Sequence, residues 1–127
     1  FALLTERPAL GEGPWTAAEE IEFWSQIIDD AQREAAEKRA DGYLQSAADE
    51  MADRAACRDT LDGERSMGRA VRAFNALYGT ELTETQGWQF MSILKKSRGA
   101  EGAYREDDYI DDIAYCALAA ESAWEQA

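Results

Sequence analysis

The chain has 127 residues, of which 46% are hydrophobic and 31% charged, a composition typical of one globular domain and not of a disordered protein. Its 26 acidic and 13 basic residues give a formal net charge of −13, which disfavours direct binding to nucleic acid because the phosphate backbone would be repelled. There is no histidine, which excludes histidine-based zinc sites and every catalytic triad or dyad that needs an imidazole.

Two further absences concern the compartment. No apolar run approaches the roughly 20 residues that span a bilayer, so we expect no membrane association. The two cysteines, Cys57 and Cys116, fall within helical patterns and lack the spacing of metal ligands. We therefore expect reduced thiols in or near the core of a cytoplasmic protein.

Residues 1–15 are predicted to form an irregular N-terminal segment, because both prolines of the chain and two glycines lie there. Residues 16–127 contain no proline and few β-branched residues, and they are rich in Ala, Glu, Leu and Arg. This composition favours helices, so we predict a single all-α domain over 16–127.

The first predicted helix begins at Thr16, with Glu19 at the capping-box position. Its apolar stripe is spaced by three and four residues and is expected to be buried: Ile21, Trp24, Ile28, Ala31 and Ala35. The second begins near Asp41 and carries Leu44, Ala47, Met51 and Ala55 on one stripe. A turn over residues 59–63 is expected to end it.

The third helix is predicted from Glu64 or Ser66 to Tyr78, with Gly79 as its stop signal. Its inward residues are expected to be Met67, Val71, Phe74, Leu77 and Tyr78. The fourth begins after Thr83, which forms a second capping-box pattern with Gln86, and ends near Arg98 and Gly99. Its stripe is Trp88, Met91 and Leu94.

The fifth helix is predicted from Asp107 or Asp108 to the C-terminus. The residues expected to be buried along it are Tyr109, Ile113, Ala117, Ala120 and Trp124. Short connections between helices of this length favour antiparallel neighbours, so we predict a compact antiparallel bundle of about five helices.

The start of the fifth helix is the strongest candidate site, because residues 106–112 contain five acids in seven positions. Asp107 with Asp111, and Asp108 with Asp111 and Asp112, are helix neighbours three or four residues apart. Their Cβ atoms are about 5–6 Å apart, a spacing at which two carboxylates can share one Mg²⁺ or Mn²⁺. The alternative is a solvated helix start in which the acids only complement the helix dipole. Helical positions also align Asp107 and Asp111 with Ala114 and Leu118, and aspartates beside packed residues need a partner.

The fourth helix supplies two bases that could be such partners. Arg98 falls on the stripe of Met91 and Leu94, and Lys95 lies at its edge. If the fourth and fifth helices pack antiparallel, both bases lie near the acidic cluster. They could form structural ion pairs that tie the hairpin together, or they could bind phosphate beside a metal-binding carboxylate pair.

A second acidic set lies on the second helix, where Glu50 and Asp53 have an E-x-x-D spacing. These residues could complete a metal site if the second helix packs against the fifth. Local ion pairs with Arg54 and Arg58 would explain the same acids without a metal.

The stretch from Ala47 to Glu121 resembles a family of small phage and prophage helical proteins of unassigned function. The residues that carry the resemblance are Gly63-Glu64-Arg65-Ser66-Met67, Gly87-Trp88-x-Phe90-Met91, Lys95-x-x-Arg98, Asp107-Asp108-Tyr109-x-Asp111 and Ala114-Tyr115-x-Ala117-Leu118. That family in turn resembles the all-α MazG-like nucleoside triphosphate pyrophosphohydrolases, which hold Mg²⁺ with an E-E-x-x-E helix and an E-x-x-D helix.

The resemblance implies a MazG-like fold, a homo-oligomer, a nucleotide ligand and a divalent cation, in the host cytoplasm if the gene belongs to a phage. Asp108-x-x-Asp111 is similar to the second motif, with Asp in place of Glu, whereas no E-E-x-x-E motif is present. The first functional hypothesis is thus a metal-dependent pyrophosphohydrolase or a nucleotide-binding relative, with the metal held by Asp107, Asp108, Asp111, Glu50 and Asp53 and phosphate by Lys95 and Arg98. The alternative is an acidic, non-enzymatic protein that binds a basic host factor in place of nucleic acid.

Overall fold

The computed structural model describes residues 14–58 and 66–127, and these residues form helices and connections without any β-strand. The helices are α1 (Ala17–Glu37), α2 (Ala40–Arg58), α3 (Ser66–Tyr78), α4 (Glu84–Gly99) and α5 (Glu106–Gln126). The all-α prediction is therefore confirmed, and the predicted turn over 59–63 lies outside the described residues. The chain divides into two compact units, residues 1–38 and residues 39–127.

Both predicted capping boxes are present. The backbone N–H of Glu19 donates to the hydroxyl of Thr16 at 3.2 Å, and the backbone N–H of Gln86 donates to that of Thr83 at 3.1 Å. In each case the long side chain returns to the backbone of the capping residue, so two N–H groups without helical partners are satisfied. The local sequence thus sets where α1 and α4 begin.

The end of α3 is set by Gly79, whose φ of +66° lies in the left-handed region that favours glycine. Its N–H donates to the carbonyl of Asn75 at 2.8 Å. The side chain of Asn75 then bridges the connection to α4, because it donates to the carbonyl of Leu82 at 2.9 Å and accepts from the N–H of Leu82 at 3.0 Å. This short, hydrogen-bonded turn fixes the entry into α4.

The first unit contains α1, and none of the residues of this helix is buried. The predicted burial of its apolar stripe is therefore wrong: Ile21 is 67% exposed, and Trp24 and Ile28 are exposed as well. The described part of this unit holds no second helix against which the stripe could pack. An amphipathic pattern predicts which face would be buried, but not that a partner is present.

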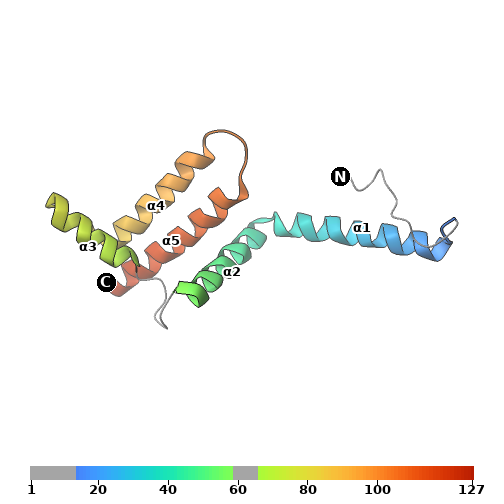
Figure 1. Ribbon diagram of the computed structural model, residues 1–127, viewed down its shortest axis with the longest axis horizontal. Coiled ribbons are helices and arrows are strands. Elements are labelled where there is room, and N and C mark those ends of the chain that lie inside the picture. Colours follow the sequence, from blue (N-terminus) through green and yellow to red (C-terminus); the bar gives the residue numbers. More distant parts are fainter. Residues whose placement is uncertain (1–13, 59–65) are drawn as a thin grey trace. The chain divides into compact units, whose positions relative to one another are not determined.

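The second unit is built on the α4–α5 hairpin, whose two helices run antiparallel, as predicted (Figure 1). Helix α2 packs against α5 and runs in the same direction (Figure 1). Arg54 of α2 contacts both Glu50 of the same helix and Asp111 of α5. Helix α3 contacts α4, where Gly87 allows a close approach. A Cβ atom at Gly87 would lie 2.5 Å from the sulfur of Met67.

The prediction for α3 was right only on the side that faces α4. Val71 is buried and Met67 is half-buried, whereas Phe74, Leu77 and Tyr78 are exposed. The stripe of α4 is confirmed, since Trp88 is buried and Met91 and Leu94 are half-buried.

The predicted buried face of α5 is wrong. Tyr109, Ala117 and Ala120 are exposed and Trp124 is 81% exposed, so that of the five predicted residues only Ile113 is half-buried. The residues of α5 that are buried are Asp108, Ile110, Ala114, Ala119 and Ser122. Helix α5 carries small or apolar residues on two sides. The side that packs against α4 and α2 is the one that also carries Asp108 and Ser122.

Among the described residues, no helix is both long enough and apolar enough to cross a membrane.

Candidate functional site

Two adjacent lysines of α4 pair with two adjacent aspartates of α5. Lys95 binds Asp111, and Lys96 binds Asp112, each at 2.8 Å. Successive helix positions are about 100° apart around the axis, so the two pairs lie on different sides of the hairpin. They belong to two clusters, which we call the three-helix cluster (Glu50, Arg54, Lys95, Asp111) and the hairpin cluster (Ser92, Lys96, Asp112, Cys116).

The three-helix cluster brings together side chains from α2, α4 and α5. Lys95 Nζ lies 2.8 Å from Oδ2 of Asp111, and both side chains are only 13% exposed. Arg54 Nη2 donates to the other oxygen of Asp111, Oδ1, at 3.0 Å, and it lies 3.5 Å from Glu50. Asp111 is therefore bound by one base on each of its oxygens.

The cluster also holds two carboxyl groups near each other, since Glu50 and Asp111 both contact the same nitrogen of Arg54, at 3.5 and 3.0 Å. Burial, and then the negative charge of Asp111, raise the pKa of Glu50, and Asp107 adds to this effect. Burial also acts to raise the pKa of Asp111, but the hydrogen bond and charge of Lys95 and the charge of Arg54 hold it below its ordinary value. Asp111 is thus the ionised member, and Glu50 carries the unfavourable charge.

The other predicted site residues lie outside this cluster. Asp107 is exposed and reaches Glu50 only through its charge. Asp108 is buried, and its Cβ lies 3.8 Å from the position that a Cβ at Gly99 would occupy, at the end of α4. Asp53 and Arg98 are exposed, and Arg98 forms no ion pair within the described residues.

Sequence reasoning did not assign a role in the site to Arg54. Its spacing of four residues from Glu50 indicated only a local ion pair along α2. The structure adds the shorter contact across to α5, which depends on the packing of α2 and has no signal in the local sequence. In the part of the chain that the structure describes, no three acids or cysteines meet as a ready-made metal site.

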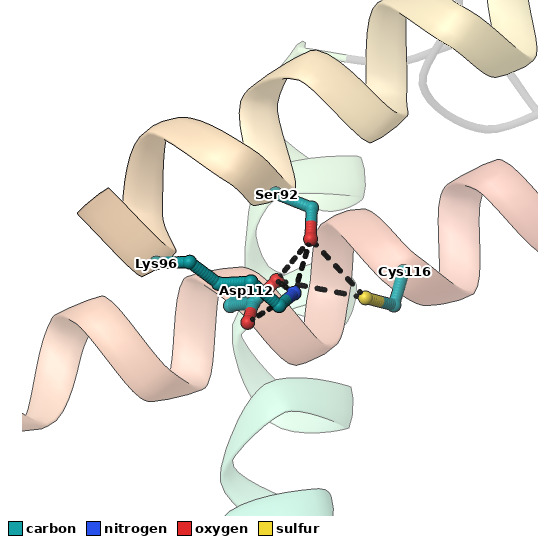
Figure 2. Close-up of polar contacts among 4 residues, drawn as sticks. All are labelled: Ser92, Lys96, Asp112 and Cys116. Atoms are coloured by element: carbon teal, nitrogen blue, oxygen red, sulfur yellow. Dashed lines mark hydrogen bonds and ion pairs between the residues drawn. The ribbon is translucent and has the colours of Figure 1, made fainter. Parts of the chain in front are cut away.

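The hairpin cluster is formed by α4 and α5 alone (Figure 2). Lys96 Nζ donates to the buried hydroxyl of Ser92 at 2.7 Å and to both oxygens of Asp112 at 2.8 and 2.9 Å. Ser92 donates a short hydrogen bond to Asp112, and the thiol of Cys116 lies 3.5 Å from the same carboxylate. Cys116 is exposed, so the expectation that this thiol lies in or near the core is wrong.

Asp112 is stabilised in its charged form, although burial acts in the opposite direction. Its hydrogen bonds from Lys96 and Ser92 hold its pKa below the ordinary value. The hydrogen bond to Asp112 in turn raises the pKa of Lys96, so this lysine stays protonated and cannot serve as a base toward Ser92. The hairpin cluster is therefore an ion pair that ties α4 to α5, in which Lys96 does not activate Ser92 as a nucleophile.

A surface pocket of about 500 Å³ lies beside the hairpin cluster, between α4 and α5. Its polar lining includes Ser92, Lys96 and Cys116, together with Thr85 and Gln89 of α4, and Ile93 with three alanines of α5 forms an apolar part. The prediction from sequence did not include it, because it had assigned part of this face of α5 to the core.

Comparisons with known proteins identify a family but no activity. No curated protein matches the chain, and no solved structure matches it either. A family model described as "Domain of unknown function (DUF6378)" matches residues 44–123, a stretch that begins within α2 and ends within α5 and thus contains both clusters. The chain belongs to this DUF6378 family.

Proposed function

We propose that the three-helix cluster binds a divalent cation together with a nucleoside triphosphate, and that the chain is a MazG-like pyrophosphohydrolase or a nucleotide-binding relative of these enzymes. One observation carries the proposal: Arg54 Nη2 contacts both Glu50 of α2 and Asp111 of α5, at 3.5 and 3.0 Å, while Lys95 binds the other oxygen of Asp111 at 2.8 Å. Carboxylates so placed repel each other, and a cation between them would remove the repulsion.

The residues fit Mg²⁺ or Mn²⁺ by the chemistry of their donor atoms. Both cations prefer oxygen ligands, and Mg²⁺ commonly binds to one or two carboxylates, several waters and the phosphates of a substrate. Glu50 and Asp111 supply two carboxylates. The exposed Asp107 lies close enough to Glu50 for its negative charge to raise the pKa of Glu50. Phosphates and waters would complete the coordination of the cation at such a site.

Motif spacing adds support. Residues Asp49-Glu50-x-x-Asp53 on α2 have the spacing of the E-E-x-x-E motif, with Asp at its first and last positions. Asp108-x-x-Asp111 on α5 has the spacing of the E-x-x-D motif, with Asp at its first position. Glu50 of the first motif and Asp111 of the second both belong to the three-helix cluster, where each contacts Arg54.

The proposed roles follow from charge and position. Arg54 and Lys95 would bind phosphate oxygens, with Arg54 able to use two parallel N–H donors and Lys95 acting as a compact charge. A bound cation would neutralise phosphate charge and lower the pKa of a coordinated water. Glu50, whose pKa is raised in the ligand-free chain, would bind the cation as a carboxylate, because a neighbouring positive charge favours its ionised form.

Thermal unfolding tests this proposal with three chains: the native protein, Glu50→Gln, and Glu81→Gln as a matched control in the exposed α3–α4 connection. Each is heated in chelator, and then in Mg²⁺ with each of the four deoxynucleoside triphosphates, while pyrophosphate release is assayed. A ligand at a hundredfold excess over its dissociation constant adds about 2.7 kcal/mol of stability. We expect the midpoint to rise for the native chain and Glu81→Gln, and not for Glu50→Gln.

Equal shifts in all three chains would place the ligand elsewhere, and no shift in any of them would contradict the proposal. Release of pyrophosphate by the native chain would identify an enzyme, whereas binding without release would identify a nucleotide-binding relative.

A second candidate, a role in binding another protein, is favoured by the exposed apolar side chains of α1 and α5, among them Ile21 and Trp124. The partner could be a second copy of the chain or a basic host protein that matches the net charge of −13. Light scattering after size-exclusion chromatography tests self-association, and salt-sensitive binding to a basic polypeptide tests the other alternative.

A further inference from the structure

Asp111 is fully engaged in the ligand-free chain. Lys95 Nζ binds its Oδ2 at 2.8 Å, and Arg54 Nη2 binds its Oδ1 at 3.0 Å. A Mg²⁺ ion approaches a carboxylate oxygen to about 2.0–2.1 Å, so it would lie within a few ångströms of both positive side chains. Cation binding at Asp111 therefore requires at least one of the bases to move away.

The bases can move only if their charges find another partner. Lys95 is only 13% exposed, and a buried charge without a partner is strongly unfavourable. A phosphate group supplies such a partner, and its negative charge replaces that of Asp111 for both bases. The arriving cation then replaces the bases on Asp111, so every charge remains compensated.

We propose that Lys95 and Arg54 block cation binding at Asp111 in the ligand-free chain and transfer to phosphate when a triphosphate binds, so that cation and phosphate bind cooperatively. This inference rests on the proposed function and adds a regulatory property: the chain binds the cation weakly until a triphosphate is present. The side chains allow the transfer, because Arg54 is 44% exposed and Lys95 has a flexible four-carbon stem.

The chain offers a matched control in Lys96, the neighbour of Lys95. Lys96 binds Asp112 at the same distance of 2.8 Å, but in the hairpin cluster, away from Glu50 and Arg54. Lys95→Gln and Lys96→Gln change the net charge equally, so a general attraction of the more acidic chain for cations would affect both alike.

The test is a calorimetric titration with Mn²⁺ alone, and then with Mn²⁺ and inorganic tripolyphosphate together. We expect Lys95→Gln to bind Mn²⁺ about tenfold more tightly than the native chain, because one competing charge is removed. Arg54→Gln should change in the same direction, and Lys96→Gln should match the native chain. Tripolyphosphate should increase Mn²⁺ affinity strongly in the native chain and less in Lys95→Gln, after correction for the Mn²⁺–tripolyphosphate complex in solution.

The outcomes separate this inference from the proposed function. If Glu50→Gln loses Mn²⁺ binding while Lys95→Gln and Arg54→Gln bind no more tightly than the native chain, the inference is overturned and the proposed function stands. If no chain binds Mn²⁺ with or without tripolyphosphate, both are overturned. Circular dichroism checks the fold of each variant, and Arg54→Gln decides the matter if Lys95→Gln fails to fold.

Discussion

The two Lys–Asp pairs of the hairpin have the same residue types, the same separation in sequence and the same N–O distance of 2.8 Å, yet their surroundings differ. Lys95 and Asp111 are each 13% exposed, and α2 adds Glu50 and Arg54 to them. Lys96 is 59% exposed, and its pair with Asp112 gains only Ser92 and Cys116 from the hairpin itself. Ion pairing alone therefore does not mark a functional site.

The difference between the pairs arises from the third helix. In the hairpin cluster every contact lowers the energy of the charged pair, as the lowered pKa of Asp112 and the raised pKa of Lys96 indicate. In the three-helix cluster, α2 brings a second carboxyl group against the first, and the pKa of Glu50 is raised. Clusters that hold an unfavourable charge are candidates for ligand binding, since a ligand can relieve it.

The largest expected effect comes from removing the acid of each pair in turn. Asp111→Asn leaves the largely buried Lys95 without its carboxylate and Arg54 with Glu50 alone, and we expect a loss of about 2 kcal/mol in the free energy of unfolding. Asp112→Asn leaves the more exposed Lys96 free to turn toward water, so about 1 kcal/mol is expected. Urea unfolding in chelator measures both, and equal losses would remove the distinction between the clusters.

Acidification should weaken both pairs, with a sign set by the lowered pKa values of Asp111 and Asp112. An aspartate whose pKa is depressed on folding stabilises the protein above its unfolded pKa, whose ordinary value is 3.8, and this contribution is lost as the pH falls through the folded value. Unfolding free energies measured from neutral to strongly acidic pH should therefore decline in the native chain, and less steeply in Asp112→Asn. An identical pH profile for Asp112→Asn would show that this aspartate has the same pKa in both states.

The local elements of the fold could be predicted from the sequence, whereas the choice of buried faces could not. Thr16 and Thr83 fix the starts of their helices through hydrogen bonds within four residues, so the pattern alone is sufficient. Helix α5 carries small or apolar residues on two sides, and which of them is covered depends on α4 and α2. The apolar Trp124 was predicted to lie in the core but is exposed, whereas the charged Asp108 was not predicted there but is buried.

The same division holds for the candidate site. The sequence indicated that Lys95 would lie near the acids of α5, because an antiparallel hairpin brings the end of α4 to the start of α5, and the ion pair with Asp111 confirms this contact. Arg98, one turn later, was predicted with Lys95 but is exposed. The contribution of α2 to the three-helix cluster comes from packing between segments about 57 residues apart, which local patterns do not encode.

A smaller effect is expected for Ser92→Ala, which sharpens the picture of the hairpin cluster. Ser92 is buried, donates to Asp112 and accepts from Lys96 at 2.7 Å. Losing these hydrogen bonds costs about 1 kcal/mol, and the better helix propensity of alanine returns about 0.5 kcal/mol. Ser97→Ala, at an exposed position of the same helix, reports the propensity gain alone. Urea unfolding should therefore rank Ser92→Ala below Ser97→Ala, and a reversed order would mean that the hydroxyl of Ser92 contributes nothing.

The smallest effect has the opposite sign and concerns Glu50→Gln in chelator. Because its pKa is raised on folding, ionised Glu50 disfavours the folded state at a pH above the folded value, and the penalty disappears below the ordinary value of 4.5, where Glu50 is protonated in both states. Its side chain is 41% exposed, so solvent screening reduces the penalty to a few tenths of a kcal/mol. Glu50→Gln should therefore be slightly more stable than the native chain at neutral pH and indistinguishable from it at acidic pH. Urea unfolding at both pH values measures this difference, and a variant less stable than the native chain at neutral pH would mean that the ion pair with Arg54 outweighs the repulsion from Asp111.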